Sequence, residues 1–179
     1  MWTLQFVPTG MAIYCHQYTE WLEVWKKSQR LIYQAFYALI EKGIHLVISS
    51  IEYGIRDVFF SNSSNASYES ILERNSFYVP QLVFKQSGAW HTHLGWFEEV
   101  KGIGEVLNKF NMDSVILIND QNNDEKIRLS IHHEQVINYT YGIDIDKQNI
   151  EHHMSNAATI TDRFHSMNKE IIEKTLTKS

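Results

Sequence analysis

One apolar stripe near the end of the chain limits the possible folds more than any other feature. Its members recur at helical spacing: Ile150, Met154, Ala157, Ile160, Phe164, Met167, Ile171 and Leu176. Such a stripe predicts a long amphipathic helix. A helix of this kind needs an apolar surface to cover, so the rest of the chain must supply one.

A second stripe predicts another helix in the first quarter of the chain. It runs through Tyr18, Trp21, Leu22, Trp25, Ile32, Phe36, Leu39 and Ile40. Charged residues occupy the opposite face, and Gly43 supplies a C-terminal stop. The preceding residues, 1–15, are apolar without a period and contain Pro8 and Gly10, so we expect an extended arm there.

Runs of branched residues predict strands between these two helices. We expect one hairpin from strands at Ile44–Tyr53 and Arg56–Phe60, with Gly54 at the turn. A second hairpin is expected from strands at Ser114–Ile118 and Lys126–His132, of which the latter alternates apolar and polar residues.

Two further helices are expected in the middle of the chain. The first runs from Tyr68 to about Ser76, where Ser67 can cap it and Pro80 prevents its continuation. The second covers Trp96–Phe110, because its apolar residues fall at helical spacing despite two internal glycines.

These elements together predict an α+β fold. We expect an αβα layout in which one antiparallel sheet is covered by helices, as in a PAS-like or GAF-like sensory fold. The sequence contains no internal repeat or linker, so residues 1–179 are expected to form a single domain.

Charge and composition narrow the partners and the compartment. The formal net charge is -5 and no basic face is visible, so we expect no direct nucleic-acid binding. No apolar run reaches bilayer length, so no membrane span is expected. Cys15 is the one cysteine and the N-terminus does not read as a signal peptide, which together predict a cytoplasmic protein.

Histidines raise the question of a metal site. His91 and His93 would share a face on a strand, whereas the adjacent His132 and His133 would point to opposite faces. No cysteine or carboxylate accompanies them at a recognised ligand spacing, so we expect no metal and no cofactor. A histidine-dependent hydrolase or metal enzyme that uses His91, His93 and either His132 or His133 is the enzymatic alternative.

Aromatic side chains gather around the least regular segment of the chain. This concentration fits a pocket with an apolar body and a few polar handles, although ordinary packing explains it about as well. The residues that we expect to line such a pocket are Tyr53, Phe59, Tyr68, Leu72, Val79, Trp90 and Phe97. Tyr68, Trp90 and Phe97 are expected to share one apolar space on the same side of the sheet.

The same segment resembles the ligand-binding domain of LuxR-family quorum-sensing regulators. The residues that carry the resemblance are Phe59-Phe60-Ser61-Asn62 at a strand end, Tyr68 near the family's helix Trp, Ile71 or Leu72 near its Tyr, Val79-Pro80 in place of Asp-Pro, and Trp90 at its later Trp. Phe97–Phe110 and Val115–Ile118 stand where the family has its next helix and strand.

The resemblance implies a non-enzymatic sensory domain that lacks the family's helix-turn-helix half. The family's Asp accepts the amide hydrogen of an acyl-homoserine lactone, and Val79 cannot accept one. We therefore expect a small apolar or amphipathic ligand without that amide, or a partner regulator. A homodimer contact through one of the long helices, and an immunity-type or effector-type interaction module, stay open as alternatives.

Overall fold

The structure is a computed structural model that describes residues 1–7, 9–17, 20–61, 67–119 and 124–177. It divides into two compact units. The first contains residues 1–48 and 141–158, and the second contains residues 49–140 and 159–179. The expectation of a single domain stays a prediction, and the two units are described separately.

The first unit contains a β-hairpin and a long helix. Strands β1 (Trp2–Val7) and β2 (Gly10–Cys15) pair antiparallel, so the expected extended arm is a two-stranded sheet. Helix α1 (Trp21–Glu41) confirms the first helical stripe from Trp21 onward, and Tyr18, the first member predicted, lies outside the described residues. Gly43 has φ 73° and donates its N–H to the Ile40 carbonyl, which ends the helix as expected.

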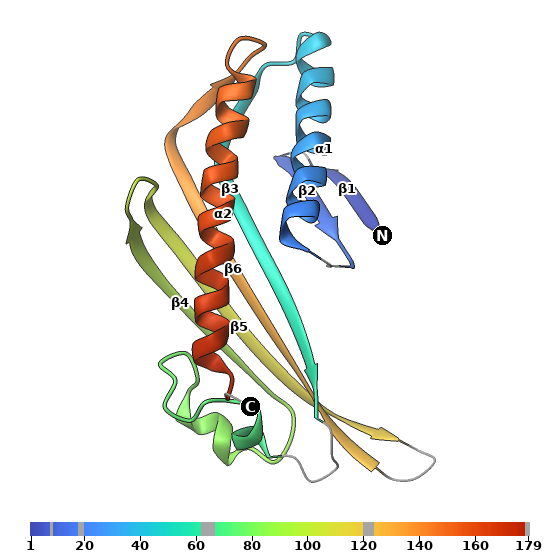
Figure 1. The fold of residues 1–179 in the computed structure, drawn as a ribbon, viewed down its shortest axis with the longest axis vertical. Helices are drawn as coiled ribbons and strands as arrows, with labels where there is room; N and C mark the ends of the chain where they lie inside the picture. The colour runs from blue at the N-terminus through green and yellow to red at the C-terminus, as the bar shows by residue number, and fades with distance from the viewer. Residues whose placement is uncertain (8, 18–19, 62–66, 120–123, 178–179) are drawn as a thin grey trace. The chain divides into compact units, whose positions relative to one another are not determined.

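The second unit is built on a four-stranded antiparallel sheet with the order β3-β6-β5-β4. Its strands are β3 (Leu46–Phe60), β4 (Trp90–Val100), β5 (Gly104–Asn119) and β6 (Asp124–Ile145). Helix α2 (Ile150–Thr175) confirms the C-terminal stripe, and its second half lies along one face of this sheet (Figure 1). Two short 3₁₀ helices, η1 (Tyr68–Ser70) and η2 (Gln81–Lys85), lie in the connection from β3 to β4.

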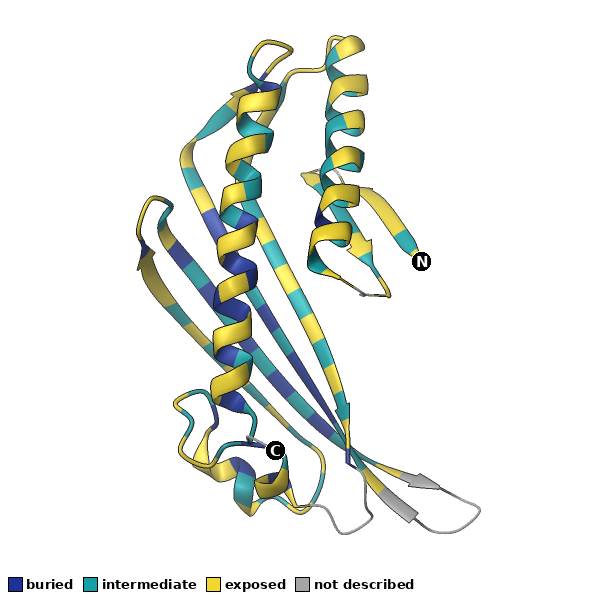
Figure 2. Ribbon diagram, in the orientation of Figure 1, coloured by how far each residue is buried: buried dark blue, intermediate teal, exposed yellow. Residues whose placement is uncertain are grey.

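Apolar side chains fill the space between the sheet and α2. We call this face of the sheet the inner face and the opposite one the outer face. Phe164 and Met167 of α2 pack against Val106 of β5 and Ile137 of β6, and Ile171 joins a larger cluster nearer the end of the helix. Figure 2 shows the buried residues concentrated on this side of α2 and along β5 and β6.

Three sequence predictions are wrong. Residues 96–110 do not form a helix, because β4 and β5 form a hairpin around Gly102 (φ 81°) and Gly104 (φ 107°), a backbone conformation that favours glycine. Gly54 makes no turn, since β3 continues through it. The expected helix from Tyr68 to Ser76 is limited to the 3₁₀ turn η1.

The coarse fold class is confirmed, since helices accompany antiparallel sheets. The described strands make two sheets, a two-stranded and a four-stranded one, where a single sheet was expected. The αβα layering and the PAS-like or GAF-like likeness stay predictions. Neither helix in the described part of the chain has the length and apolar character that a bilayer crossing needs.

Candidate functional site

Five of the seven predicted pocket residues meet in one cluster on the inner face. Tyr68, Leu72 and Val79 are buried there, with Phe59 and Trp90 packed against them. The rings of Tyr68 and Trp90 meet edge to face at 5.4 Å between centroids. These contacts form a core, and whether a ligand enters it stays a prediction.

We call residues 67–89, which contain η1 and η2, the cover segment. Hydrogen bonds hold the cover segment to the sheet and to α2. The Tyr68 hydroxyl donates to the Gly88 carbonyl at 3.2 Å and lies 3.0 Å from Ser114 Oγ. The Glu73 N–H donates to the Thr175 carbonyl at 2.8 Å, and a β-bridge joins Leu72 to Leu176. The segment thus fastens the C-terminal end of α2 to the sheet.

The other two predicted pocket residues lie elsewhere. Tyr53 packs near Phe164 in a second cluster, and its hydroxyl lies 3.2 Å from His165 Nδ1. Phe97 is 65% exposed and points to the outer face, because residues on a strand alternate between faces and Trp90 points inward. The expectation that Tyr68, Trp90 and Phe97 share one space is therefore wrong.

A belt of polar side chains is buried between the sheet and α2. Asn108, His133, Gln135 and Asn168 are each less than 5% exposed. His133 Nδ1 lies 3.0 Å from Asn168 Oδ1, and its Nε2 lies 3.2 Å from Asn108 Oδ1. Trp96 stacks on the imidazole ring at 6.0 Å with an interplanar angle of 8°. Burial is the main reason why the pKa of His133 falls from 6.5 to about 4.

The protonation of His133 decides how this belt is hydrogen-bonded. A neutral imidazole carries one N–H and cannot donate to two amide oxygens. Asn108 Nδ2 and Gln135 Oε1 are buried without partners in the described structure. Turning the Asn108 amide about its last torsion lets its NH₂ donate to Nε2, so a neutral ring with its proton on Nδ1 satisfies both contacts. Gln135 Nε2 donates to Met167 Sδ at 3.6 Å, which joins this amide to α2.

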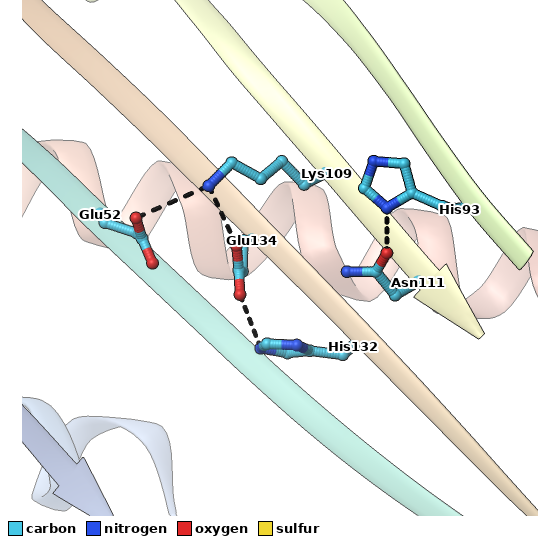
Figure 3. A network of polar contacts seen from close by, with 6 residues as sticks. All are labelled: Glu52, His93, Lys109, Asn111, His132 and Glu134. Carbon is cyan, nitrogen blue, oxygen red and sulfur yellow. Dashed lines mark hydrogen bonds and ion pairs between the residues drawn. The ribbon is translucent and has the colours of Figure 1, made fainter. Parts of the chain in front are cut away.

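The outer face carries a second polar network, shown in Figure 3. Lys109 Nζ lies 3.2 Å from Glu134 and 3.8 Å from Glu52, and His132 lies 3.4 Å from the other Glu134 oxygen. A Cβ at Gly54 would stand 3.3 Å from both Glu134 Cγ and His132 Nε2. A larger residue at this position of β3 would require these two side chains to shift by a few tenths of an ångström.

Histidines are not gathered into a metal site. Among residues that the structure describes, no group of three or more His, Cys, Asp or Glu side chains is placed to hold a metal ion. His93 Nδ1 bonds instead to Asn111 Oδ1, as Figure 3 shows, and His133 points to the inner face while His132 points outward. The expectation that adjacent histidines separate is confirmed, and the hydrolase alternative stays untested.

Next to this network lies a hollow of about 270 Å³, where the pairing of β5 with β6 ends. We call it the outer hollow after the outer-face residues in its lining, which also includes Ile103, Ile137 and Tyr139 of the inner cluster. Phe97, Leu107 and Val136 are register partners across β4, β5 and β6, and we call them the apolar row. They line the hollow together with Ile103, Gly104, Glu105, Ile137, Asn138, Tyr139 and Thr140. An exposed aromatic ring beside charged residues is typical of a binding surface.

Sequence reasoning found Phe97 but missed the rest of this surface. Lys109, Glu134 and the apolar row come together only through the register of three strands. The available signal was the glycine pair Gly102 and Gly104, which marks a hairpin turn within the misread helix.

Comparisons of the chain with protein families, curated proteins and solved structures found no match. The function must therefore be argued from the geometry of these surfaces.

Proposed function

We propose that this chain is a non-enzymatic binding protein that docks a partner protein on the outer face of its four-stranded sheet. The hollow at the apolar row carries the proposal. Drug-sized ligands occupy pockets of about 300–1,000 Å³, and this hollow of about 270 Å³ is smaller. It suits one inserted side chain of a larger partner.

The network of Lys109, Glu134 and Glu52 also supports a protein-docking role for the outer face. Lys109 and Glu134 lie next to the apolar row along β5 and β6 and are partly exposed, and Glu52 beside Lys109 is exposed. A polar rim around a small apolar centre is the usual arrangement of a non-obligate protein interface. The rim fixes orientation, and Phe97 supplies the aromatic anchor that such interfaces favour.

Selection from a random peptide library displayed on phage tests this proposal. Peptides enriched on the full chain should shift the backbone amide resonances of residues 95–109 and 134–138. Phe97→Ser should weaken their binding by about tenfold, the effect of removing a hot-spot ring. Phe77→Ser is the matched control, because Phe77 is 82% exposed and lies in the cover segment. Enriched peptides that bind the Phe97 variant as well as the wild type would refute the docking surface.

A small-ligand sensory role is the second candidate, and one observation favours it. Trp90 Nε1 is buried and has no hydrogen-bond partner among the described residues. A buried donor of this kind is costly unless an acceptor reaches it, and the carbonyl of a ligand is one such acceptor. A thermal-shift screen of homoserine lactones against fatty acids tests this role, with Trp90→Phe as the variant that removes the donor. A shift that persists in Trp90→Phe would count against it.

A further inference from the structure

We propose that the group inserted into the outer hollow is a basic side chain, an arginine or a lysine of the partner protein. This inference rests on the docking role proposed above and specifies its chemistry. It is carried by the arrangement of charges around the apolar row.

Two carboxylates stand directly opposite each other beside the hollow. Glu99 of β4 and Glu105 of β5 are register partners, so their side chains lie on the same face, and both are exposed. Like charges in this position destabilise a sheet. Among the described residues neither carboxylate forms an ion pair, and Lys101 in the adjoining turn forms none with them. A cation from outside the chain would relieve the repulsion.

The apolar row suits the rest of a basic side chain. Phe97 precedes Glu99 by two residues on the outer face of β4, and its exposed ring can take a cation on its face. Leu107 and Val136 form an apolar floor beside it. Long basic side chains lay their methylene groups along such surfaces while the charged head stays near water.

An anionic group would not suit the hollow. Exposed Lys101 in the turn is outnumbered by the two carboxylates of Glu99 and Glu105 beside it. Lys109, on β5, already lies between the carboxylates of Glu134 and Glu52. That group of three side chains carries two negative charges against one positive charge. A neutral apolar group would fill the hollow but would leave Glu99 and Glu105 in mutual repulsion.

Three short peptides test the inference. They are identical except for one central residue, which is arginine, citrulline or glutamate; citrulline keeps the shape of arginine without its charge. Each is titrated into the ¹⁵N-labelled full chain while the amides of residues 95–109 and 134–140 are followed. The arginine peptide should bind about tenfold more tightly than the citrulline peptide, and added salt should reduce the difference. The glutamate peptide should not bind.

Variants of Glu99 and Glu105 test whether these two carboxylates cause the preference for the arginine peptide over the citrulline peptide. Glu105→Gln should remove most of the arginine preference, and Glu99→Gln should reduce it. Glu173→Gln is the matched control, because Glu173 is exposed on α2 and should leave the preference unchanged. All three positions are exposed, so the variants should fold as the wild type does.

The outcomes separate this inference from the docking proposal. Equal binding of the arginine and citrulline peptides, with no effect of Glu105→Gln, overturns the basic anchor and leaves the docking surface in place. If no peptide of the three shifts the outer-face amides, the basic anchor is also overturned. The docking proposal then depends on whether the library yields peptides without basic residues that need Phe97.

Discussion

Replacing the buried imidazole of His133 should change how the stability of this protein depends on pH. The ring is 1% exposed and its pKa is about 4 in the folded protein, against 6.5 for an ordinary histidine. Burial is the largest cause, and the hydrogen bond with Asn168 opposes it. Protons therefore bind the unfolded chain in preference to the folded one, so stability is complete above about pH 6.5 and is lost as the pH falls towards 4.

The size of the effect follows from that difference in pKa. One pKa unit corresponds to about 1.4 kcal/mol of stability. The fall of the His133 pKa from 6.5 to about 4 therefore corresponds to about 3 kcal/mol in total. Roughly 2.5 kcal/mol of this lies between about pH 7 and about pH 4.5. The ring is almost fully buried, so solvent screening does not reduce the figure much.

Urea unfolding at about pH 7 and about pH 4.5 measures this loss of stability. Wild type and His133→Gln are compared, because glutamine does not titrate but keeps an amide for the polar belt. Carboxylates titrate equally in both proteins and cancel in the comparison. The wild type should lose about 2.5 kcal/mol more than the variant on acidification. His91→Gln is the control, since His91 is exposed and should leave the wild-type loss unchanged.

Equal losses in wild type and His133→Gln would refute the buried neutral ring. The ¹⁵N spectrum of the ring gives an independent check, because the turned Asn108 amide requires a proton on Nδ1, which faces Asn168, and none on Nε2. A doubly protonated ring at neutral pH would overturn the proposed orientation of Asn108.

Three other predictions concern stability measured by urea unfolding. Glu105→Lys should stabilise the protein by about 0.5 kcal/mol, because it converts the repulsion with Glu99 into an attraction, and a loss of stability would contradict the pairing. Gly142→Ala should destabilise by at least about 1 kcal/mol, since φ is 68° there and the new Cβ would meet Val47 Cγ1 at 2.5 Å. Leu72→Ala should cost about 2–5 kcal/mol, because the side chain is fully buried, and a cost near zero would show that its cluster is open.

The sequence predicted the two long helices because each depends on a local pattern. The stripe from Ile150 onward repeats at helical spacing, and Gly43 ends α1 with a positive φ. Strand positions were also found where branched residues cluster, as at Ser114–Ile118 within β5. These elements are specified by neighbours in sequence, so the printed residues suffice to find them.

The hairpin of β4 and β5 was missed because its apolar residues satisfy two patterns. Val100, Val106 and Phe110 fit a helical spacing, yet the same residues line the inner face of two strands. Gly102 and Gly104 decide between the two, since both need a positive φ that a helix interior does not allow. Gly54 was wrongly taken for a turn, whereas β3 continues through it and side chains from β6 lie close to its Cα.

The candidate site could not be predicted from the sequence for a related reason. Phe97, Leu107 and Val136 are spread over three strands and become neighbours only when the register is known. A shift of one residue in the register of any one of these strands would send its member of the apolar row to the inner face. The opposition of Glu99 and Glu105 is likewise a product of register, and no linear motif contains it. A surface assembled in this way leaves no short pattern to recognise, so its chemistry has to be inferred from the charges and the ring that the folded sheet brings together.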